Sequence, residues 1–298
     1  MASQPQLGAI LTAMVTPFDR DGDVNEESTR RLARHLVEHG SDGLVVAGTT
    51  GEAPTLSDEE KLRLLEVTVD EVGGEATIVA GTGSNDTAHS IKLTRQACDH
   101  GADAVLVVTP YYNKPPRRGL IEHFRAVAAA SDKPVVLYNI PSRTVINLEP
   151  DLLAELAEIE NVMAVKQANA DMDQARQLIS NGGLAVYAGD DNLLRPFAEI
   201  GGAGGVCVTS HLFGDQMKEM YEAAAGGEGD RAREIDAGLK DVYETVFMTS
   251  GTITTKAALN LLGFDVGDSR LPLVEASDDE RAAVHSMLER HGLVASAA

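Results

Sequence analysis

Tryptophan is absent from this sequence of 298 residues, and aromatic residues make up only 4% of it. With so few aromatic side chains, each tyrosine that follows an apolar run becomes a candidate for a specific role. No apolar run reaches the ~18 residues that a membrane-spanning helix requires. The opening "MASQPQLGAI" has no basic segment followed by a long apolar one, so we expect no signal peptide and a cytoplasmic location.

Basic residues and cysteines are also scarce. Lys and Arg together number 25, against 46 Asp and Glu, which gives a formal net charge of −21. Nucleic acids and acidic membrane surfaces bind clustered Lys and Arg, so we expect neither as a partner. The two cysteines, Cys98 and Cys207, cannot by themselves form a disulfide scaffold or a four-ligand zinc site. We therefore expect two free thiols in a reducing compartment.

Short apolar runs recur along the chain, separated by roughly 20 to 35 residues, the length of one strand–helix unit in a (β/α)8 barrel. Each run is apolar nearly throughout, which is typical of parallel strands covered on both faces. The eight runs are "AILTAMVTPF", "GLVVAGTTGE", "ATIVAGTGSN", "AVLVVTPYYN", "PVVLYNIPSR", "NVMAVKQAN", "LAVYAGDDN" and "GVCVTSHLF".

Amphipathic helical patterns lie between these runs. The segment "SDEEKLRLLEVTVDEVGG" opens with a capping box from Ser57 to Glu60 and is expected to stop at Gly73. The segments "NEESTRRLARHLVEHG" and "NDTAHSIKLTRQACDHG" follow the same scheme and end at Gly40 and Gly101. Strands and helices therefore alternate along most of the chain.

This alternation predicts an α/β fold, a (β/α)8 TIM barrel with a C-terminal helical extension. We assign residues 1–225 to the catalytic barrel and residues 226–298, which show helical spacing and no strand signal, to the extension. A doubly wound open sheet is the alternative, because eight strand–helix units do not prove that the sheet closes.

Polar residues gather where the apolar runs end, and the other ends of the runs are plain. In (β/α)8 enzymes the chemistry lies at the C-terminal ends of the strands, so this asymmetry is a functional signal. The residues in question are Gly48, Thr49 and Thr50 of "GTTGE", Tyr111, Tyr112, Tyr138, Arg143, Lys166, Gly189 and Asp190 of "GDD", Thr209, Ser210 and His211.

Lys166 ends the apolar run "NVMAVKQAN", where a charged amine is costly unless it is paired or neutral. One interpretation is a structural ion pair with Asp190 or Glu52. The other is a nucleophile, because an apolar barrel interior disfavours the charged form of an amine. A neutral amine can attack a ketone and form a Schiff base, which is an electron sink for carbanion chemistry. The polar residues at the neighbouring strand ends favour the nucleophile.

Several of these neighbours also have two interpretations. Thr49 and Thr50 belong to a tight strand–helix turn or to an anion nest, and a carboxylate suits such a nest better than a phosphate because no P-loop lysine follows. Tyr138 and Tyr112 are packed tyrosines or proton carriers linked through Thr49. Arg143 is a surface residue or a clamp for a second carboxylate.

Five motifs in register resemble one known family. The motifs "GTTGE", "VTPYYNKP", "YNIPSRT", the lysine of "VKQAN" and "GDD" are similar to those of the pyruvate-dependent class I aldolases of the dihydrodipicolinate synthase / N-acetylneuraminate lyase family. The resemblance extends in order over nearly the whole chain, including the helical C-terminal part. It implies the same (β/α)8 barrel.

The resemblance also implies a covalent mechanism without an external cofactor or a metal. Pyruvate would form a Schiff base on Lys166, and Tyr138, Thr49 and Tyr112 would relay protons, with Tyr112 supplied by a neighbouring subunit. Members are usually homotetramers built from tight dimers, so the resemblance implies self-association. Pyruvate would then condense with L-aspartate 4-semialdehyde and cyclise to the first heterocycle of lysine and diaminopimelate biosynthesis.

The substrate-binding roles follow from the same resemblance. Thr49 and Thr50 would hold the carboxylate of pyruvate, and Arg143 would hold that of the aldehyde. Sugar-acid lyases of the family generally lack an arginine there, so Arg143 favours the synthase over a lyase that acts on N-acetylneuraminate or a 2-keto-3-deoxy acid. The other expected substrate-binding residues are Gly48, Gly189, Asp190 and Val206.

Two further alternatives come from other classes of function. A metal-dependent aldolase would use Asp190, Asp191 and His211, all of which follow the last two apolar runs. A catalytically silent barrel would serve as a binding or regulatory protein, although the complete set of strand-end residues argues against it.

Departures from the family pattern concern regulation. Lysine-inhibited members tend to carry a Ser, His residues and a Glu around an effector site at the dimer interface. The matching positions here are Ala53, Asp58, Lys61 and His89, whereas Asn85 and Tyr111 still match. Because Lys61 repels a cationic effector and the Glu countercharge is missing, we expect weak or absent inhibition by lysine. Gln167, where many members carry an acid, has no evident role in the sequence.

Overall fold

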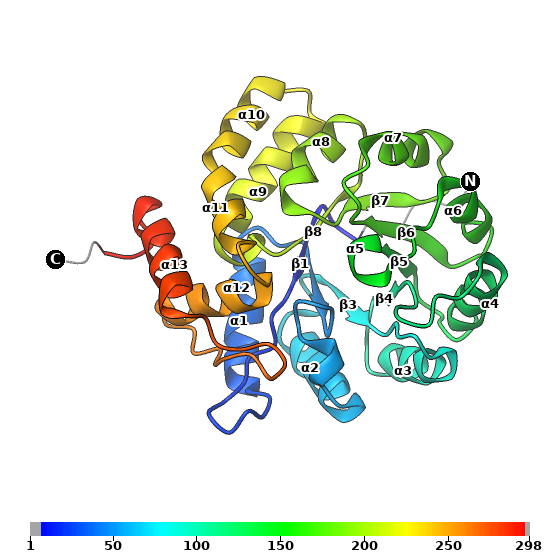
Figure 1. Cartoon of the computed structure of the whole chain (residues 1–298), viewed down its shortest axis with the longest axis horizontal. Helices are drawn as coiled ribbons and strands as arrows, with labels where there is room; N and C mark the ends of the chain where they lie inside the picture. Colours follow the sequence, from blue (N-terminus) through cyan, green and yellow to red (C-terminus); the bar gives the residue numbers. More distant parts are fainter. Residues whose placement is uncertain (1–6, 296–298) are drawn as a thin grey trace.

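The computed structural model describes residues 7–295, which form a closed barrel of parallel strands in chain order (Figure 1). The predicted TIM barrel is therefore confirmed, and the open doubly wound sheet is wrong. The expectation that no signal peptide is present concerns an N-terminal segment of which residues 1–6 lie outside the described part. The strands are β1 (Ile10–Ala13), β2 (Gly43–Val46), β3 (Thr77–Gly81), β4 (Ala104–Val108), β5 (Val135–Asn139), β6 (Val162–Gln167), β7 (Ala185–Ala188) and β8 (Gly204–Cys207).

Helices surround the barrel, and the last four lie together on the side of β8 and α1 (Figure 1). No helix within residues 7–295 is long and apolar enough to cross a membrane. The helices are α1 (Glu26–Glu38), α2 (Asp58–Val72), α3 (Thr87–Asp99), α4 (Arg117–Ala128), α5 (Pro141–Thr144), α6 (Pro150–Leu156), α7 (Met172–Asn181), α8 (Leu194–Glu199), α9 (Ser210–Ala225), α10 (Gly229–Gly238), α11 (Lys240–Val246), α12 (Gly251–Leu261) and α13 (Asp278–Arg290), with short 3-10 helices η1 (Ala53–Thr55) and η2 (Asp191–Leu193).

Local capping interactions explain where the helices begin and end. The Ser57 hydroxyl accepts a hydrogen bond from the Glu60 N–H, and the Glu60 carboxylate accepts one from the Ser57 N–H, so the predicted capping box of α2 is confirmed. Gly40 and Gly101, which follow α1 and α3, have φ angles of 90° and 92°. Glycine adopts this left-handed conformation without steric cost, so it ends a helix cleanly.

The barrel closes where β8 pairs with β1. Gly204 has a φ of 150°, and a Cβ atom there would collide with the carbonyl oxygen of Ala9. Gly204 and Gly205, which lie inside β8, thus allow the first and last strands to approach closely. A side chain at this point would force the seam of the barrel apart.

The C-terminal helices share a hydrophobic core with the barrel. Buried residues of α11, α12 and α13, namely Val242, Ala258 and Met287, belong to the same apolar cluster as Ile10 of β1 and Val206 of β8. Burial of apolar surface contributes roughly 25 cal/mol per Å². The C-terminal helices are therefore packed on the barrel, where they also contact the "GTTGE" loop that follows β2.

Candidate active site at the C-terminal ends of the strands

Lys166 and Tyr138 lie side by side inside the barrel. They are direct partners in the register of β5 and β6, and the Lys166 Nζ lies 4.3 Å from the centroid of the Tyr138 ring. Their exposed fractions are 6% and 5%. Lys166 has the same strand parity as Ala164, which belongs to the interior apolar cluster, so the amine points into the barrel.

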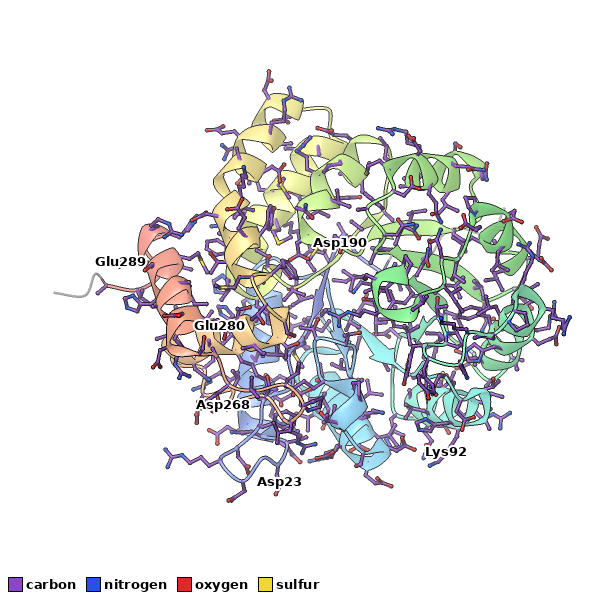
Figure 2. The ribbon with its side chains drawn as sticks, viewed as in Figure 1. Asp23, Lys92, Asp190, Asp268, Glu280 and Glu289 are labelled. Atoms are coloured by element: carbon purple, nitrogen blue, oxygen red, sulfur yellow. The ribbon has the colours of Figure 1, made fainter. Side chains whose placement is uncertain are left out.

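The alternative of a structural ion pair for Lys166 is not realised. Glu52 is paired with Lys256, with 2.7 Å between the Glu52 Oε1 and the Lys256 Nζ. Within residues 7–295, no carboxylate lies within 4.0 Å of the Lys166 Nζ. Asp190, labelled in Figure 2, is half-buried just after β7. Burial raises its pKa, and the charge of Lys166 opposes that shift. Lys166 is thus an interior amine without a close counterion.

Gln167 points the other way, because successive strand residues face opposite sides. Its Oε1 accepts a hydrogen bond from the Asn139 Nδ2 at 3.1 Å, and the same amide donates to the Asn147 Oδ1 at 2.8 Å. Asn139 and Gln167 are fully buried between the barrel and its helices. Gln167 therefore joins β5 and β6 on their outer side. These two strands carry Tyr138 and Lys166 as direct partners on the inner side.

The loop "GTTGE" leaves β2 in a tight turn beside this pair. The N–H of Ala53 donates to the carbonyl of Gly48 at 3.1 Å, and the Thr16 hydroxyl donates to the carbonyl of Gly51 at 2.6 Å. Within residues 7–295, the N–H groups of Thr49 and Thr50 have no protein acceptor. Two free N–H groups and two hydroxyls in one turn suit a carboxylate.

A cavity of about 550 Å³ opens at this end of the barrel. It is lined by Gly48, Thr49, Tyr138 and Arg143 of the predicted site. Arg143 lies on the short helix α5, directly after β5. The cavity thus joins the threonine loop, the tyrosine beside Lys166 and a guanidinium, as the strand-end prediction requires. Thr50, Lys166, Gly189, Asp190 and Val206 do not line it.

Gly189 and Val206, two of the expected substrate-binding residues, are packed against neighbouring strands. The Gly189 N–H donates to the Gln167 carbonyl at 2.8 Å, and a Cβ on Gly189 would lie 2.5 Å from the Ala168 Cβ. Gly189 therefore keeps the ends of β6 and β7 together beside Lys166. Val206 is buried within β8, in register with Leu11 of β1.

Tyr112 does not line the cavity of its own chain. Its side chain is 89% exposed, and its φ is 73°, a left-handed conformation that is uncommon for a large residue. Tyr111 beside it is 37% exposed and lines the cavity. The structure of one chain therefore presents the Tyr112 ring outward and does not bring it to Lys166.

Two of the three residues of the metal-dependent alternative, Asp191 and His211, are already engaged by the backbone. Asp191 is buried and accepts hydrogen bonds from the N–H groups of Val208, at 3.0 Å, and Thr209, at 2.5 Å. The His211 Nδ1 donates to the Val208 carbonyl at 2.7 Å, and its Nε2 accepts from the Val15 N–H at 3.1 Å. Burial lowers the pKa of His211 to about 4. Both ring nitrogens are thus committed to the backbone, so a metal-ligand role for His211 is not supported.

The sequence analysis missed one set of residues next to the site. Lys256 and Arg270 belong to the C-terminal region, yet both contact Glu52 of the "GTTGE" loop. The available signal was weak: Lys256 interrupts the apolar helix "TTKAALNLLG" as Lys166 interrupts its strand. Nothing in the sequence indicated which acid it would meet.

The fold and the strand-end cavity define an enzyme of the (β/α)8-barrel class, and comparisons with known proteins give its family. The sequence model of the Dihydrodipicolinate synthetase family matches residues 6–291. The 4-hydroxy-tetrahydrodipicolinate synthase of Desulforudis audaxviator is 49% identical over 289 residues, which cover 96% of this chain and 98% of that protein. The chain therefore belongs to the dihydrodipicolinate synthetase family.

Solved structures agree with this assignment. The dihydrodipicolinate synthase of Cyanidioschyzon merolae, solved with lysine bound, has a TM-score of 0.94 and 39% identity, covering 97% of this chain and 99% of that one. The chloride-inhibited enzyme of Acinetobacter baumannii, complexed with pyruvate, has a TM-score of 0.94 and 36% identity, covering 97% and 100%. These names do not favour the sugar-acid lyase alternative.

Proposed function

We propose that the protein is a lyase that condenses pyruvate with L-aspartate 4-semialdehyde to 4-hydroxy-tetrahydrodipicolinate, a step of lysine biosynthesis. The observation that carries this proposal is the interior amine of Lys166 beside the Tyr138 ring, which lines a cavity together with Thr49 and Arg143. Membership of the dihydrodipicolinate synthetase family supports the substrates.

The proposed chemistry begins with the Lys166 amine attacking the ketone carbon of pyruvate. Loss of water gives the Schiff base, and loss of a proton from the methyl group gives the enamine. The enamine carbon then forms a bond to the aldehyde carbon of the second substrate, whose oxygen takes up a proton. The amino group of that substrate finally attacks the Schiff-base carbon, closes the ring and releases Lys166. No external cofactor or metal takes part in these steps.

Each proton in this sequence needs a carrier at the barrel mouth. Tyr138 is the proposed carrier next to the amine, because its ring contacts the Lys166 Nζ, and the Thr49 hydroxyl extends the path toward the open cavity. Tyr112 is the proposed outer member and would come from a second copy of the chain, since its side chain points away from its own cavity.

The two carboxylates of the substrates have separate proposed sites. Thr49 and Thr50 offer free N–H groups and hydroxyls to pyruvate close to Lys166, whereas Arg143 offers a planar pair of donors to the aldehyde at the rim. Gly48, Gly189, Asp190 and Val206 complete the proposed surroundings of the substrates. The barrel over residues 1–225 is the proposed catalytic unit, with residues 226–298 as its extension.

Self-association follows from the incomplete proton path. We infer a homotetramer built from dimers in which each chain lends Tyr112 to its neighbour. The free thiols of Cys98 and Cys207 suit the reducing conditions of the cytoplasm, the proposed location.

Turnover with a panel of aldehydes tests the proposal. Pyruvate with L-aspartate 4-semialdehyde is expected to be consumed at least tenfold more efficiently, as kcat/KM, than pyruvate with N-acetylmannosamine or another sugar aldehyde. Equal or greater efficiency with a sugar aldehyde would contradict the proposed second substrate. It would not contradict the proposed Schiff base, which forms with pyruvate.

A further inference from the structure

A buried ion pair joins the "GTTGE" loop to the C-terminal region. The Glu52 and Lys256 side chains are only 1% and 2% exposed, and 2.7 Å separates the Glu52 Oε1 from the Lys256 Nζ. Burial lowers the pKa of Lys256, and the Glu52 carboxylate opposes that shift. A pair this deep repays its desolvation only when further hydrogen bonds satisfy both groups.

Those further contacts come from the loop between α12 and α13. The Arg270 N–H donates to the Glu52 Oε2 at 2.8 Å, and the Lys256 Nζ donates to the carbonyl of Asp268, which is labelled in Figure 2, at 3.1 Å. The Phe18 ring contacts both cations, with its centroid 4.1 Å from the Lys256 Nζ and 4.3 Å from the Arg270 guanidinium carbon. Both Glu52 oxygens are therefore held by the C-terminal region.

Glu52 occupies a backbone conformation that favours glycine, which indicates that its side chain has a structural role. Glu52 has φ 58° and ψ 35°, the left-handed region that glycine occupies without cost and that costs a residue with a Cβ about 1 kcal/mol or more. The turn alone therefore favours glycine at this position. The carboxylate offsets that cost by anchoring the turn.

The anchored turn carries the proposed pyruvate-binding groups. The Glu52 N–H donates to the carbonyl of Thr49 at 3.1 Å, so fixing Glu52 fixes the peptide next to it. The hydroxyl of Thr252, on α12, donates to the carbonyl of Thr50 at 3.2 Å. The Thr49 carbonyl shares a peptide plane with the Thr50 N–H, and the Gly48 carbonyl, which accepts from the Ala53 N–H, shares one with the Thr49 N–H. Holding these two carbonyls therefore keeps the N–H groups of Thr49 and Thr50 in one orientation. The Thr252 hydroxyl fixes the next peptide of the turn, between Thr50 and Gly51.

We propose that Glu52 and Lys256, with Thr252, are positioning residues that hold the Thr49–Thr50 turn in the geometry that binds the carboxylate of pyruvate. This inference rests on the proposed function, which assigns that carboxylate to the turn. The C-terminal region then acts on one substrate only, because the Arg143 site of the aldehyde lies on α5 and receives no contact from the ion pair.

Steady-state kinetics of the variants Glu52→Gln and Lys256→Met test the proposal. Both variants are expected to raise the KM for pyruvate on the order of tenfold, because a small misplacement of donors weakens binding of a carboxylate, while the KM for the aldehyde stays within about twofold. Thr252→Val keeps the ion pair and removes one hydroxyl, so it is expected to give the same split with a smaller rise. This third variant keeps the test decisive if the two ion-pair variants do not fold.

The matched control is Arg195→Met, which breaks another part-buried contact outside the site. Arg195 on α8 pairs with Asp236 at 2.8 Å and with Glu199 at 2.7 Å, and it does not touch the "GTTGE" loop. This variant is expected to lower the thermal midpoint without changing either KM. The proposal is overturned if folded Glu52→Gln, Lys256→Met and Thr252→Val keep the wild-type KM for pyruvate, or if Arg195→Met raises it equally. Failure of the wild-type protein to trap pyruvate with borohydride would instead refute the proposed function.

Discussion

At the scale of single residues, the proposed mechanism depends on an amine that has no close counterion. Lys166 is 6% exposed and contacts the Tyr138 ring, whereas the second buried lysine, Lys256, is paired with Glu52 at 2.7 Å. The two side chains are chemically identical, and only their partners differ. The Lys256 amine is held by the Glu52 carboxylate and the Asp268 carbonyl, whereas the Lys166 amine has no carboxylate within 4.0 Å in the described residues, so we expect Lys166 to be the nucleophile.

Replacement of Lys166 by Ala is expected to lower kcat by a factor on the order of 10³ or more, because the covalent step is lost. The circular dichroism spectrum and the thermal midpoint should stay close to those of the wild type, since a buried amine without a counterion contributes little to stability. Retention of full activity by the folded variant would show that the mechanism is wrong.

Arg143 is expected to determine the affinity for the aldehyde. Arg143→Gln removes a charge-assisted pair with a carboxylate, worth about 1.5 to 3 kcal/mol, or roughly 10- to 150-fold in kcat/KM for L-aspartate 4-semialdehyde. The KM for pyruvate should change less than twofold. A larger effect on pyruvate than on the aldehyde would reverse the assignment of the two carboxylate sites.

At the scale of elements, the start of α9 is tied to β1 through a neutral histidine. The Nε2 of His211 accepts a hydrogen bond from the Val15 N–H, so it must be unprotonated in the folded chain. Burial lowers the pKa of His211 to about 4, from an ordinary value of 6.5. The unfolded chain therefore binds a proton below pH 6.5 that the folded chain does not bind until about pH 4.

This difference predicts a loss of stability in acid. The free energy of unfolding should fall as the pH drops from 6.5 toward 4, by up to about 3 kcal/mol from His211 alone. His123, whose pKa burial also lowers to about 4, adds to the same trend. Urea unfolding of His211→Gln should show a flatter dependence of the free energy of unfolding on pH than unfolding of the wild type. An equal slope in His211→Gln and wild type would contradict the prediction.

The ends of helices and the order of strands were the features that the sequence predicted best. The capping box at Ser57 and the glycines at 40 and 101 are local signals, so they indicate helix ends without knowledge of the fold. The strand-end rule placed Tyr138 and Lys166 together, because consecutive strands of a barrel are neighbours. The contact of Glu52 with Lys256 was not predictable in this way, because it joins segments far apart in the chain and has no periodic signal. Tyr112 was expected in the site, but only from the family resemblance.

At the scale of the whole molecule, the exposed Tyr112 predicts an active site shared between two chains. A mixture of Lys166→Ala and Tyr112→Phe proteins, unfolded together and refolded, should regain activity that neither parent shows. In a mixed dimer, one site combines an intact Lys166 with an intact Tyr112 from the neighbour. Refolding each parent alone is the control, and no gain in the mixture would place Tyr112 outside the shared site.

Regulation by lysine is expected to be weak or absent. Ala53, Asp58, Lys61 and His89 line the same cavity as Tyr138. Burial raises the pKa of Asp58, but hydrogen bonds from His89 and Lys92 outweigh it and hold that pKa below its usual value. The Asp58 carboxylate is thus already paired with side chains of the same chain and is not free to bind a cationic effector. The half-buried Lys61 repels such an effector.

Initial rates measured against L-lysine test this expectation. The wild type should keep most of its activity at millimolar lysine, whereas His89→Glu, which replaces an imidazole by a carboxylate, should become more sensitive to lysine. A clear micromolar inhibition curve for the wild type would contradict the prediction.

The central claim is that pyruvate forms a Schiff base with one lysine of this chain. The most direct measurement is borohydride reduction of the wild-type protein with pyruvate alone, followed by peptide mass spectrometry. The account predicts one pyruvate-derived label per chain, on Lys166 and not on Lys256, with the label lost in Lys166→Ala and unaffected by a metal chelator. Absence of a label, or a label on any other lysine, would contradict it.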